Sequence, residues 1–332
     1  MMLPQRRSDD EAAFRATFAS EVAEGLRTVP RQIPSKYLYD ELGSSLFEAI
    51  CRLPWYRITR AESSLLAQHA REILGPLAHA VSLAELGCGS GEKIALLASA
   101  AGERFQLIQL IDISRAALDM ARYRLRAIGI RAVLTHHATY EQGLARIAQP
   151  RTLDGSLLVL FLGSNIGNFA PPVARDLLRR IRRSLRPGDG LLLGTDLVKP
   201  ERELLLAYDD PLQVTAAFDR NLLRRINDEL GGNFDLDAFD HRASWNAAER
   251  RVEMHLVSTR AQHVSIEAAS IDLAFGEGES IWTESSHKYE PGQVLEEGHA
   301  AGFSGGEQWI DETARCALTR FSVMDEADLG DH

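Results

Sequence analysis

Short runs of aliphatic residues recur through the middle of the chain, and stretches with helical spacing separate them. The runs lie at residues 80–86, 105–111, 132–134, 157–162 and 191–194. Strands that are almost continuously apolar are typical of a parallel sheet whose two faces are covered by helices. The alternation therefore predicts βαβ units and an α/β fold of the Rossmann-like type.

The parts of the chain on either side of these runs have different patterns. Residues 1–70 read as helices and loops, with helical spacing clearest at 61–73 and no obvious strand. Residues from 200 to about 250 also read as helix-rich, and Gly231 and Gly232 interrupt them.

Polar and apolar residues alternate in the last third of the chain, as they do in antiparallel strands. The alternating segments are 251–257 and 264–266, and a later strand pair is expected at 306–310 and 316–323. We therefore expect three parts, in which the chain leaves the main domain for an inserted lobe and then returns to it. They are an N-terminal helical segment (1–70), the main α/β domain (71–196 and 288–332) and an inserted substrate-binding lobe (197–287).

Composition and charge narrow the class of partner. The 332 residues include 37 Lys and Arg against 47 Asp and Glu, a formal net charge of −10. Nucleic-acid binding requires basic surface that neutralises phosphates, so a small-molecule substrate is the better expectation. The 3 cysteines lack the spacing of a disulfide framework or a zinc site, and no metal site is predicted. The sequence has no signal-like or membrane-spanning apolar segment, so we expect a cytoplasmic protein. We also expect a monomer.

A glycine-rich turn is the first candidate for chemistry. Residues 85–91 read Glu-Leu-Gly-Cys-Gly-Ser-Gly, after a predicted strand and before a helix that begins at Glu92 and Lys93. Glycines allow the backbone to approach a ligand closely, because no Cβ is in the way. Asp112 ends the next apolar run, where an acidic residue can hold ribose hydroxyls. The turn therefore predicts a nucleotide-like cofactor.

The spacing of the glycines favours S-adenosylmethionine over NAD. NAD enzymes usually carry G-x-G-x-x-G, with the helix N-terminus facing a pyrophosphate, whereas this turn has the form E-x-G-x-G-x-G. S-adenosylmethionine has no phosphate to place there. A glycine turn without any ligand remains the alternative.

Several further segments together are similar to the family of histidine Nα-methyltransferases, which trimethylate L-histidine to hercynine in ergothioneine biosynthesis. The segments extend from about residue 30 to residue 325, and their combination is far more specific than any one of them. They are PSKYLYD (34–40), LPWY (53–56) with TRAE (59–62), FLGSNIGNF (161–169), GTDLVK (194–199), AYDD (207–210), VEMH (252–255) and TESSHKY (283–289).

The resemblance implies a substrate pocket that holds the amino acid at both ends. The α-amino acid part would be bound by Asn168 and Tyr208, with Tyr56 and Gly163 in the same pocket, and Met254 would pack against the ring. Glu284 and Ser286 would meet the imidazole, and an acceptor beside a donor satisfies both nitrogens of a neutral imidazole. The ordinary alternatives are a surface Tyr208, an Asn168 that caps the next helix, a core Met254, and a solvated loop for Glu284 and Ser286.

The resemblance also implies a cofactor-binding set, and the chain departs from the family at one point in it. The set comprises Gly87, Gly89, Lys93, Asp112, Thr139 and Tyr140. The family typically has an Asp-aromatic pair after the third strand to contact adenine, whereas this chain has Thr139 and Tyr140. A threonine hydroxyl is a weaker acceptor for the adenine amino group than a carboxylate is, so this contact is expected to differ.

The reaction that this implies is direct methyl transfer to the substrate amine, helped mainly by alignment of the reacting atoms. An α-amino group titrates at about 8 and must lose its proton first; Tyr39 or Tyr56 is the candidate relay. The alternatives are Nα-methylation of another amino acid such as tryptophan, a non-catalytic S-adenosylmethionine-binding protein, and an NAD dehydrogenase.

Overall fold

The computed structural model describes residues 4–147 and 155–324, and their contacts group into two compact units. One unit combines Met1–Ile50, Glu201–Asn246 and Val252–Ser285. The other, which we call the α/β unit, combines Cys51–Pro200, Ala247–Arg251 and Ser286–His332. We call the first the split unit.

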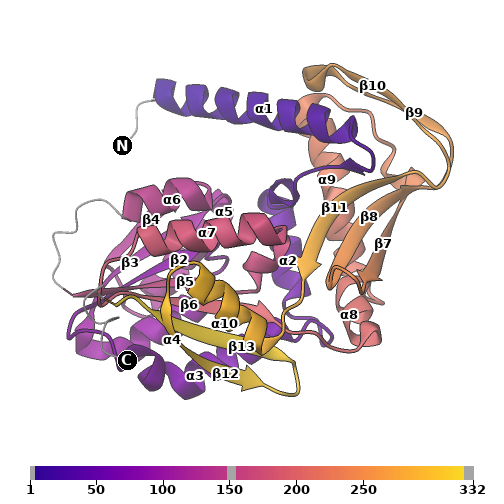
Figure 1. The fold of residues 1–332 in the computed structure, drawn as a ribbon. Helices are drawn as coiled ribbons and strands as arrows, with labels where there is room; N and C mark the ends of the chain where they lie inside the picture. The colour runs from indigo at the N-terminus through magenta and orange to yellow at the C-terminus, as the bar shows by residue number, and fades with distance from the viewer. Residues whose placement is uncertain (1–3, 148–154, 325–332) are drawn as a thin grey trace. The chain divides into compact units, whose positions relative to one another are not determined.

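The α/β unit is built on a seven-stranded sheet, in the order β12-β13-β6-β5-β2-β3-β4 (Figure 1). The strands from β6 to β4 run parallel, and β12 and β13 are antiparallel to their neighbours. The bounds are β2 Val81–Leu86, β3 Phe105–Asp112, β4 Val133–His137, β5 Ser156–Phe161, β6 Gly190–Asp196, β12 Ser304–Asp311 and β13 Cys316–Ser322. The predicted α/β fold with a mainly parallel sheet is confirmed.

Helices cover both faces of this sheet. On one face α6, α7 and α10 pack together over a buried aliphatic core, and Figure 1 shows α3 and α4 on the opposite side. The central strands β5 and β6 are buried along their whole length, which explains their continuous apolar sequence. The helices are α3 Ile58–Leu74, α4 Glu92–Ala101, α5 Arg115–Ala127, α6 Tyr140–Ile147, α7 Pro171–Arg183 and α10 Pro291–Ala300, with 3-10 turns η2 Gly102–Arg104 and η3 Asn165–Asn168.

The split unit holds a four-stranded sheet, in the order β1-β11-β8-β7, and a hairpin of β9 and β10. Helix α9 packs against α2 and β7, and α1 packs against β1. The helices are α1 Pro4–Leu26, α2 Glu41–Ile50, α8 Glu201–Tyr208 and α9 Val214–Leu230, with 3-10 turns η1 Ser35–Leu38, η4 Leu236–Ala238 and η5 Glu267–Ala269. The strands are β1 Arg31–Gln32, β7 Phe239–Asn246, β8 Arg251–Ser258, β9 Gln262–Ile266, β10 Ile271–Phe275 and β11 Ser280–His287.

One expectation and one alternative about local structure were wrong. The helix-rich stretch ends at Leu230, and residues 239–246 form the strand β7. This strand lies at the edge of its sheet and is mostly not fully buried, so its sequence does not alternate clearly between polar and apolar residues. The ordinary reading of Glu284 and Ser286 as a solvated loop also fails, because both lie in β11 and both are buried. The sequence pattern did not predict β11, because polar residues occupy buried positions in it. Within the described ranges, no helix has the length and apolar character to cross a membrane.

Candidate functional site

The glycine turn joins β2 to α4 in backbone conformations that suit glycine. Gly87, Gly89 and Gly91 have φ angles of 72°, 48° and 71°, in the left-handed region. A Cβ added at Gly87 would lie 2.7 Å from Asn165 Nδ2 and 2.9 Å from the Tyr140 hydroxyl. Two polar side chains therefore pack closely against the turn, which they can do only because Gly87 has no Cβ.

The carboxylate of Asp112 connects the ends of β2 and β3. Its Oδ2 accepts a hydrogen bond from the Gly89 backbone N–H at 3.2 Å, and its Oδ1 accepts one from the Ser114 N–H at 2.8 Å. Burial raises the pKa of this carboxyl, although the backbone donors oppose the shift. The predicted ribose-binding residue thus also holds the glycine turn in place.

Thr139 and Tyr140 have separate roles at the start of α6. Thr139 Oγ1 accepts from the Gln142 N–H at 3.4 Å, and Gln142 Oε1 accepts from the Thr139 N–H at 3.3 Å. This reciprocal pair is a capping box. Tyr140 makes edge contacts with Phe161 and Phe169, with centroids 5.2 and 6.1 Å apart. The residue that replaces the family's aspartate therefore caps a helix, and the tyrosine that follows it is held near the glycine turn.

A buried carboxylate, Glu62, links three segments of the α/β unit. Lys93 Nζ donates to its Oε2 at 2.8 Å, and the Gly163 N–H lies 2.8 and 2.9 Å from its two oxygens. Glu62 is fully buried, and the Lys93 side chain is only 18% exposed. Two predicted ligand-binding residues, Lys93 and Gly163, are thus held in place by a residue that we did not predict.

Glu85, at the end of β2, is a second buried carboxylate beside this network. Neither of its oxygens has a hydrogen-bond partner among the described residues. Burial raises its pKa from 4.5 to about 8, against the opposing charge of Lys93. Glu85 is therefore mostly protonated in the folded protein at neutral pH.

The raised pKa of Glu85 predicts a pH-dependent stability. Between pH 4.5 and 8 the folded state keeps a proton that the unfolded state releases, so the free energy of unfolding falls as pH rises, by at most about 1.4 kcal/mol per pH unit. Urea unfolding of the cofactor-free protein from pH 5 to 8 measures this slope. The Glu85→Gln variant should lack this contribution, and parallel curves for the two proteins would contradict the shift.

The α/β unit also carries the predicted substrate residues Tyr56, Asn168 and Ser286. Tyr56 is buried in the turn before α3. Asn168 ends η3, and the residue that begins α7 as its N-cap is Ala170. The alternative that Asn168 caps this helix is therefore wrong.

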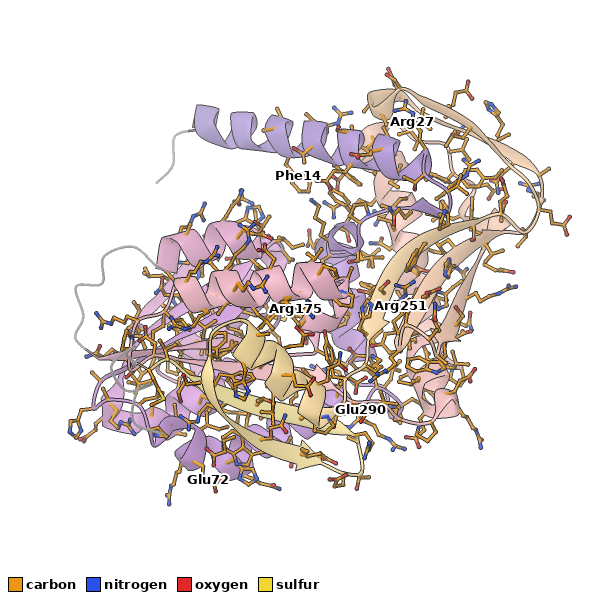
Figure 2. All side chains as sticks on the ribbon, in the orientation of Figure 1. Phe14, Arg27, Glu72, Arg175, Arg251 and Glu290 are labelled. Carbon is orange, nitrogen blue, oxygen red and sulfur yellow. The ribbon has the colours of Figure 1, made fainter. Side chains whose placement is uncertain are left out.

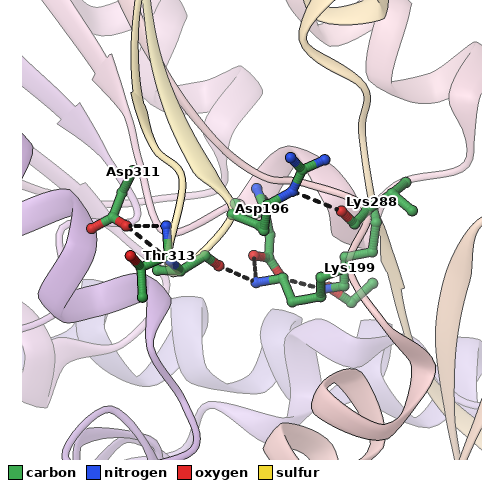
Figure 3. Close-up of polar contacts among 10 residues, drawn as sticks. Asp196, Lys199, Lys288, Asp311 and Thr313 are labelled. Carbon is green, nitrogen blue, oxygen red and sulfur yellow. Dashed lines mark hydrogen bonds and ion pairs between the residues drawn. The ribbon is translucent and has the colours of Figure 1, made fainter.

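Ser286 belongs to a chain of charged hydrogen bonds. Figure 3 shows Lys199 and Lys288 at the carboxylate of Asp196. Lys288 Nζ donates to Ser286 Oγ at 2.8 Å and pairs with Asp196 at 2.9 Å, while Lys199 pairs with the same carboxylate at 2.6 Å. Burial alone would raise the pKa of Asp196, but the two ammonium groups outweigh it and hold the pKa below its usual value. An ammonium group only donates, so Ser286 Oγ must accept from Lys288 and direct its own hydrogen elsewhere.

In the split unit, Tyr39 and Tyr208 are held by neighbouring side chains. The Tyr39 ring makes edge contacts with Phe47 and Phe218, at a centroid distance of 5.5 Å in each case. The Tyr208 carbonyl accepts from His241 Nε2 at 2.8 Å, and His241 Nδ1 lies 2.7 Å from Asp219. His241 therefore has a structural role, because it fixes the end of α8.

Met254 and Glu284 lie on the neighbouring strands β8 and β11 of the split unit. Met254 is 1% exposed, and its carbonyl accepts from Thr283 Oγ1 at 3.0 Å. Glu284 is buried too, and its carbonyl accepts from the Trp282 ring N–H at 2.9 Å. Side chains two residues apart on a strand point to the same side, so Glu284 and Ser286 share one side of β11.

The structure thus groups the predicted residues only in part. Within the α/β unit, Gly87 lies near Tyr140, Gly89 binds Asp112, and Lys93 lies near Gly163. The contacts that we did not predict come from Glu62, Asn165, Asp196 and Lys288. All four lie inside the segments that suggested the family, yet their residue types alone are typical of protein surfaces.

The chain is similar over most of its length to one protein family and to several named proteins. The model of a family described as histidine-specific, SAM-dependent methyltransferases matches residues 18–323. Histidine N-alpha-methyltransferase of Mycolicibacterium smegmatis is 41% identical over 90% of this chain and 92% of that protein, and the Mycobacterium tuberculosis protein of the same name is 39% identical over 93% and 96%. Ergothioneine biosynthesis protein 1 of Schizosaccharomyces pombe is 27% identical over 87% of this chain and 39% of that protein.

These matches extend over nearly the whole described chain and include the glycine turn, the Glu62 network and the strand that carries Glu284 and Ser286. Family membership follows from their extent and identity. The chain belongs to the family of histidine-specific, S-adenosylmethionine-dependent methyltransferases.

Proposed function

We propose that this chain trimethylates the α-amino group of L-histidine to hercynine, as a step of ergothioneine biosynthesis. The observation that carries the proposal is the match of the histidine-specific family over residues 18–323, together with two relatives, 41% and 39% identical, that are named for this substrate. The Schizosaccharomyces pombe relative, named for ergothioneine biosynthesis, supports the pathway.

The glycine turn and its neighbours fit S-adenosylmethionine. A side chain at Gly87 would clash with Asn165 Nδ2 and with the Tyr140 hydroxyl, so glycine lets these two polar groups lie beside the backbone of the turn. Gly87, Gly89, Lys93, Asp112, Thr139 and Tyr140 form the proposed binding set. When bound, S-adenosylmethionine supplies an electrophilic methyl group on its sulfonium sulfur. Because Thr139 caps α6, we propose that adenine is positioned more by Tyr140 than by Thr139.

Ser286 and Glu284 would recognise the imidazole as a donor and an acceptor. Lys288 makes Ser286 Oγ an acceptor, so the serine hydroxyl donates to the unprotonated ring nitrogen. The carboxylate of Glu284 then accepts from the ring N–H on the same side of β11. A substrate that lacks either ring group leaves a buried polar atom unsatisfied, which costs about 1–3 kcal/mol. This pairing favours histidine over tryptophan.

The remaining proposed residues would hold and deprotonate the amino acid. Asn168 and Tyr208 bind its α-amino and carboxylate groups, and Met254 packs against the ring. Tyr39 or Tyr56 relays the proton that leaves the ammonium group before the nitrogen lone pair forms its bond to the methyl carbon. Aromatic faces near the nitrogen would stabilise the quaternary ammonium product.

We also propose that the enzyme acts as a cytoplasmic monomer on free L-histidine. Its net charge of −10 disfavours nucleic acid as a partner. Sedimentation at several protein concentrations tests the monomer, because a mass that rises with concentration would contradict it.

The substrate is tested by titrating the protein with histidine, tryptophan and tyrosine in the presence of S-adenosylhomocysteine, and by mass spectrometry of the reaction products. We expect selective binding of histidine and products that carry up to three methyl groups. Preferential binding of tryptophan would refute the histidine assignment. Binding of histidine without any methylated product would favour a non-catalytic binding protein.

Replacing Glu284 by glutamine tests the proposed acceptor without a change in side-chain shape. The amide keeps an acceptor oxygen but loses the charge, so KM for histidine should rise about tenfold, which corresponds to about 1.4 kcal/mol. Affinity for S-adenosylhomocysteine should stay unchanged. Glu279→Gln on the loop before β11 is the control, because Glu279 is exposed and its side chain pairs with Arg31. Equal KM values for wild type and the Glu284 variant would contradict the role.

A further inference from the structure

A cavity of about 190 Å³ lies within the α/β unit, between α7, β6, the end of β11 and α10. Its walls combine apolar side chains, Ile166, Leu178, Leu193 and Val294 among them, with polar and charged side chains. Arg175, labelled on α7 in Figure 2, lies at the cavity and pairs with Glu297 through two hydrogen bonds of 2.7 Å. This volume suits a fragment-sized molecule, because sites for larger ligands usually measure about 300–1,000 Å³.

Three polar side chains of the cavity wall have an atom without a hydrogen-bond partner among the described residues. The atoms are Thr195 Oγ1, His287 Nε2 and Gln293 Oε1, and all three are closed to bulk solvent. Thr195 is 0% exposed and His287 5%. Each buried polar atom without a partner costs about 1–3 kcal/mol. Three such atoms around one cavity mark it as a place where a bound molecule gains hydrogen bonds.

The hydrogen-bond polarity of the wall can be read from His287. Its Nδ1 lies 2.9 Å from the Gly167 carbonyl oxygen, which only accepts, so Nδ1 carries the hydrogen. Burial lowers the pKa of this imidazole, and the ring is therefore neutral at physiological pH. Its Nε2 is then an acceptor. Gln293 Oε1 is also an acceptor, and the Thr195 hydroxyl can donate or accept.

From these contacts we propose that the cavity is a second ligand site, which takes small, uncharged azoles or amides. Such molecules offer an N–H to His287 Nε2 or Gln293 Oε1 and an acceptor atom to the Thr195 hydroxyl. Their flat apolar parts can pack against the aliphatic side chains of the wall. Arg175 pairs with Glu297, and Lys288 pairs with Asp196, so these charges of the wall are already neutralised and favour neither a cation nor an anion. A simple anion has no donor for His287 Nε2.

His287 connects this site to the loop that carries Asn168. A ligand that donates to Nε2 polarises the ring and strengthens the bond from Nδ1–H to Gly167, because hydrogen bonds in a chain reinforce one another. Gly167 lies in η3, one residue before Asn168, and a Cβ on Gly167 would lie 2.7 Å from the His287 carbonyl oxygen. An occupied cavity would therefore stiffen η3.

The test is a titration with pyrazole, which is uncharged at neutral pH and carries an N–H next to an acceptor nitrogen. Ligand-observed NMR and calorimetry would follow its binding to protein that is saturated with L-histidine and S-adenosylhomocysteine. Thr195→Val removes the hydroxyl with little change in shape, and Thr195→Ser keeps it. We expect binding that weakens about tenfold in the valine variant and less than threefold in the serine variant.

Ala174→Leu, which adds bulk to a wall residue on α7, should abolish binding by filling the cavity. The melting temperature of each variant shows whether it is folded. If one variant does not fold, binding to the other variants tests the proposal. Absence of pyrazole binding to wild type, or unchanged binding in both Thr195→Val and Ala174→Leu, would overturn the proposal. The substitutions lie in the cavity wall, so the outcome does not depend on whether histidine is the substrate.

Discussion

Replacing Glu62 by glutamine lowers the free energy of unfolding by about 3–5 kcal/mol, the cost of removing one partner from a buried ion pair. Glu62 is 0% exposed and is the counterion of Lys93, whose side chain is 18% exposed. Its pair with Lys93 and its bonds to the Gly163 N–H join α3, α4 and the loop after β5. Urea unfolding at pH 7 measures the loss.

The matched control is Glu92→Gln, one residue before Lys93 in the chain. Glu92 also pairs with a cation, Arg124 at 3.1 Å, but the two side chains are 54% and 34% exposed. Exposed pairs contribute about 0–1 kcal/mol, so this variant should stay within that range of wild type. Equal losses for Glu62→Gln and Glu92→Gln would mean that the buried network does not stabilise the fold.

The central sheet could be predicted from the sequence because its strands are buried on both faces. Burial of β5 and β6 from end to end leaves short apolar runs, and the alternation of such runs with helical stretches indicates a parallel sheet. The strand β11 could not be predicted in the same way. Glu284 and Ser286 occupy buried positions in it, so its alternation of polar and apolar residues is broken.

The chemistry of the site was predictable where backbone geometry dictates the residue type. Gly87 and Gly89 are needed for left-handed backbone, and sequence spacing alone places them before a helix. Glu62 and Lys288 gave no such signal. A single glutamate or lysine is usually solvated, and these two are buried because Lys93 and Asp196, distant in the sequence, neutralise them.

Thr139 illustrates a third situation, in which one residue has two possible roles. It occupies the family's adenine-contact position, and its hydroxyl completes a capping box with Gln142. The T-x-x-Q spacing was visible in the sequence and predicts this cap as directly as it predicts a ligand contact. Only the hydrogen-bond partners in the structure distinguish the two.

Replacing Lys288 by methionine is expected to lower kcat/KM for L-histidine about a hundredfold, while affinity for S-adenosylhomocysteine stays close to that of wild type. Lys288 is a positioning residue in this proposal, because it acts on the imidazole through Ser286. In the variant, no ammonium group donates to Ser286 Oγ. The serine hydroxyl can then rotate, and its hydrogen is no longer directed to the substrate. Hydrogen bonds to charged groups contribute about 1.5–3 kcal/mol, which corresponds to a ten- to hundredfold change.

Lys199→Met separates this role from general stability. Lys199 pairs with the same Asp196 carboxylate and donates to the Ala314 carbonyl, whereas Lys288 is the lysine that donates to Ser286 Oγ. Both variants remove one of the two ammonium partners of Asp196, so a loss that came only from the carboxylate would be equal in the two proteins. A loss at least tenfold larger for Lys288→Met than for Lys199→Met, carried mainly by KM, assigns the effect to Ser286. Equal losses would instead mean that Asp196 needs both cations and that Ser286 is not oriented by Lys288.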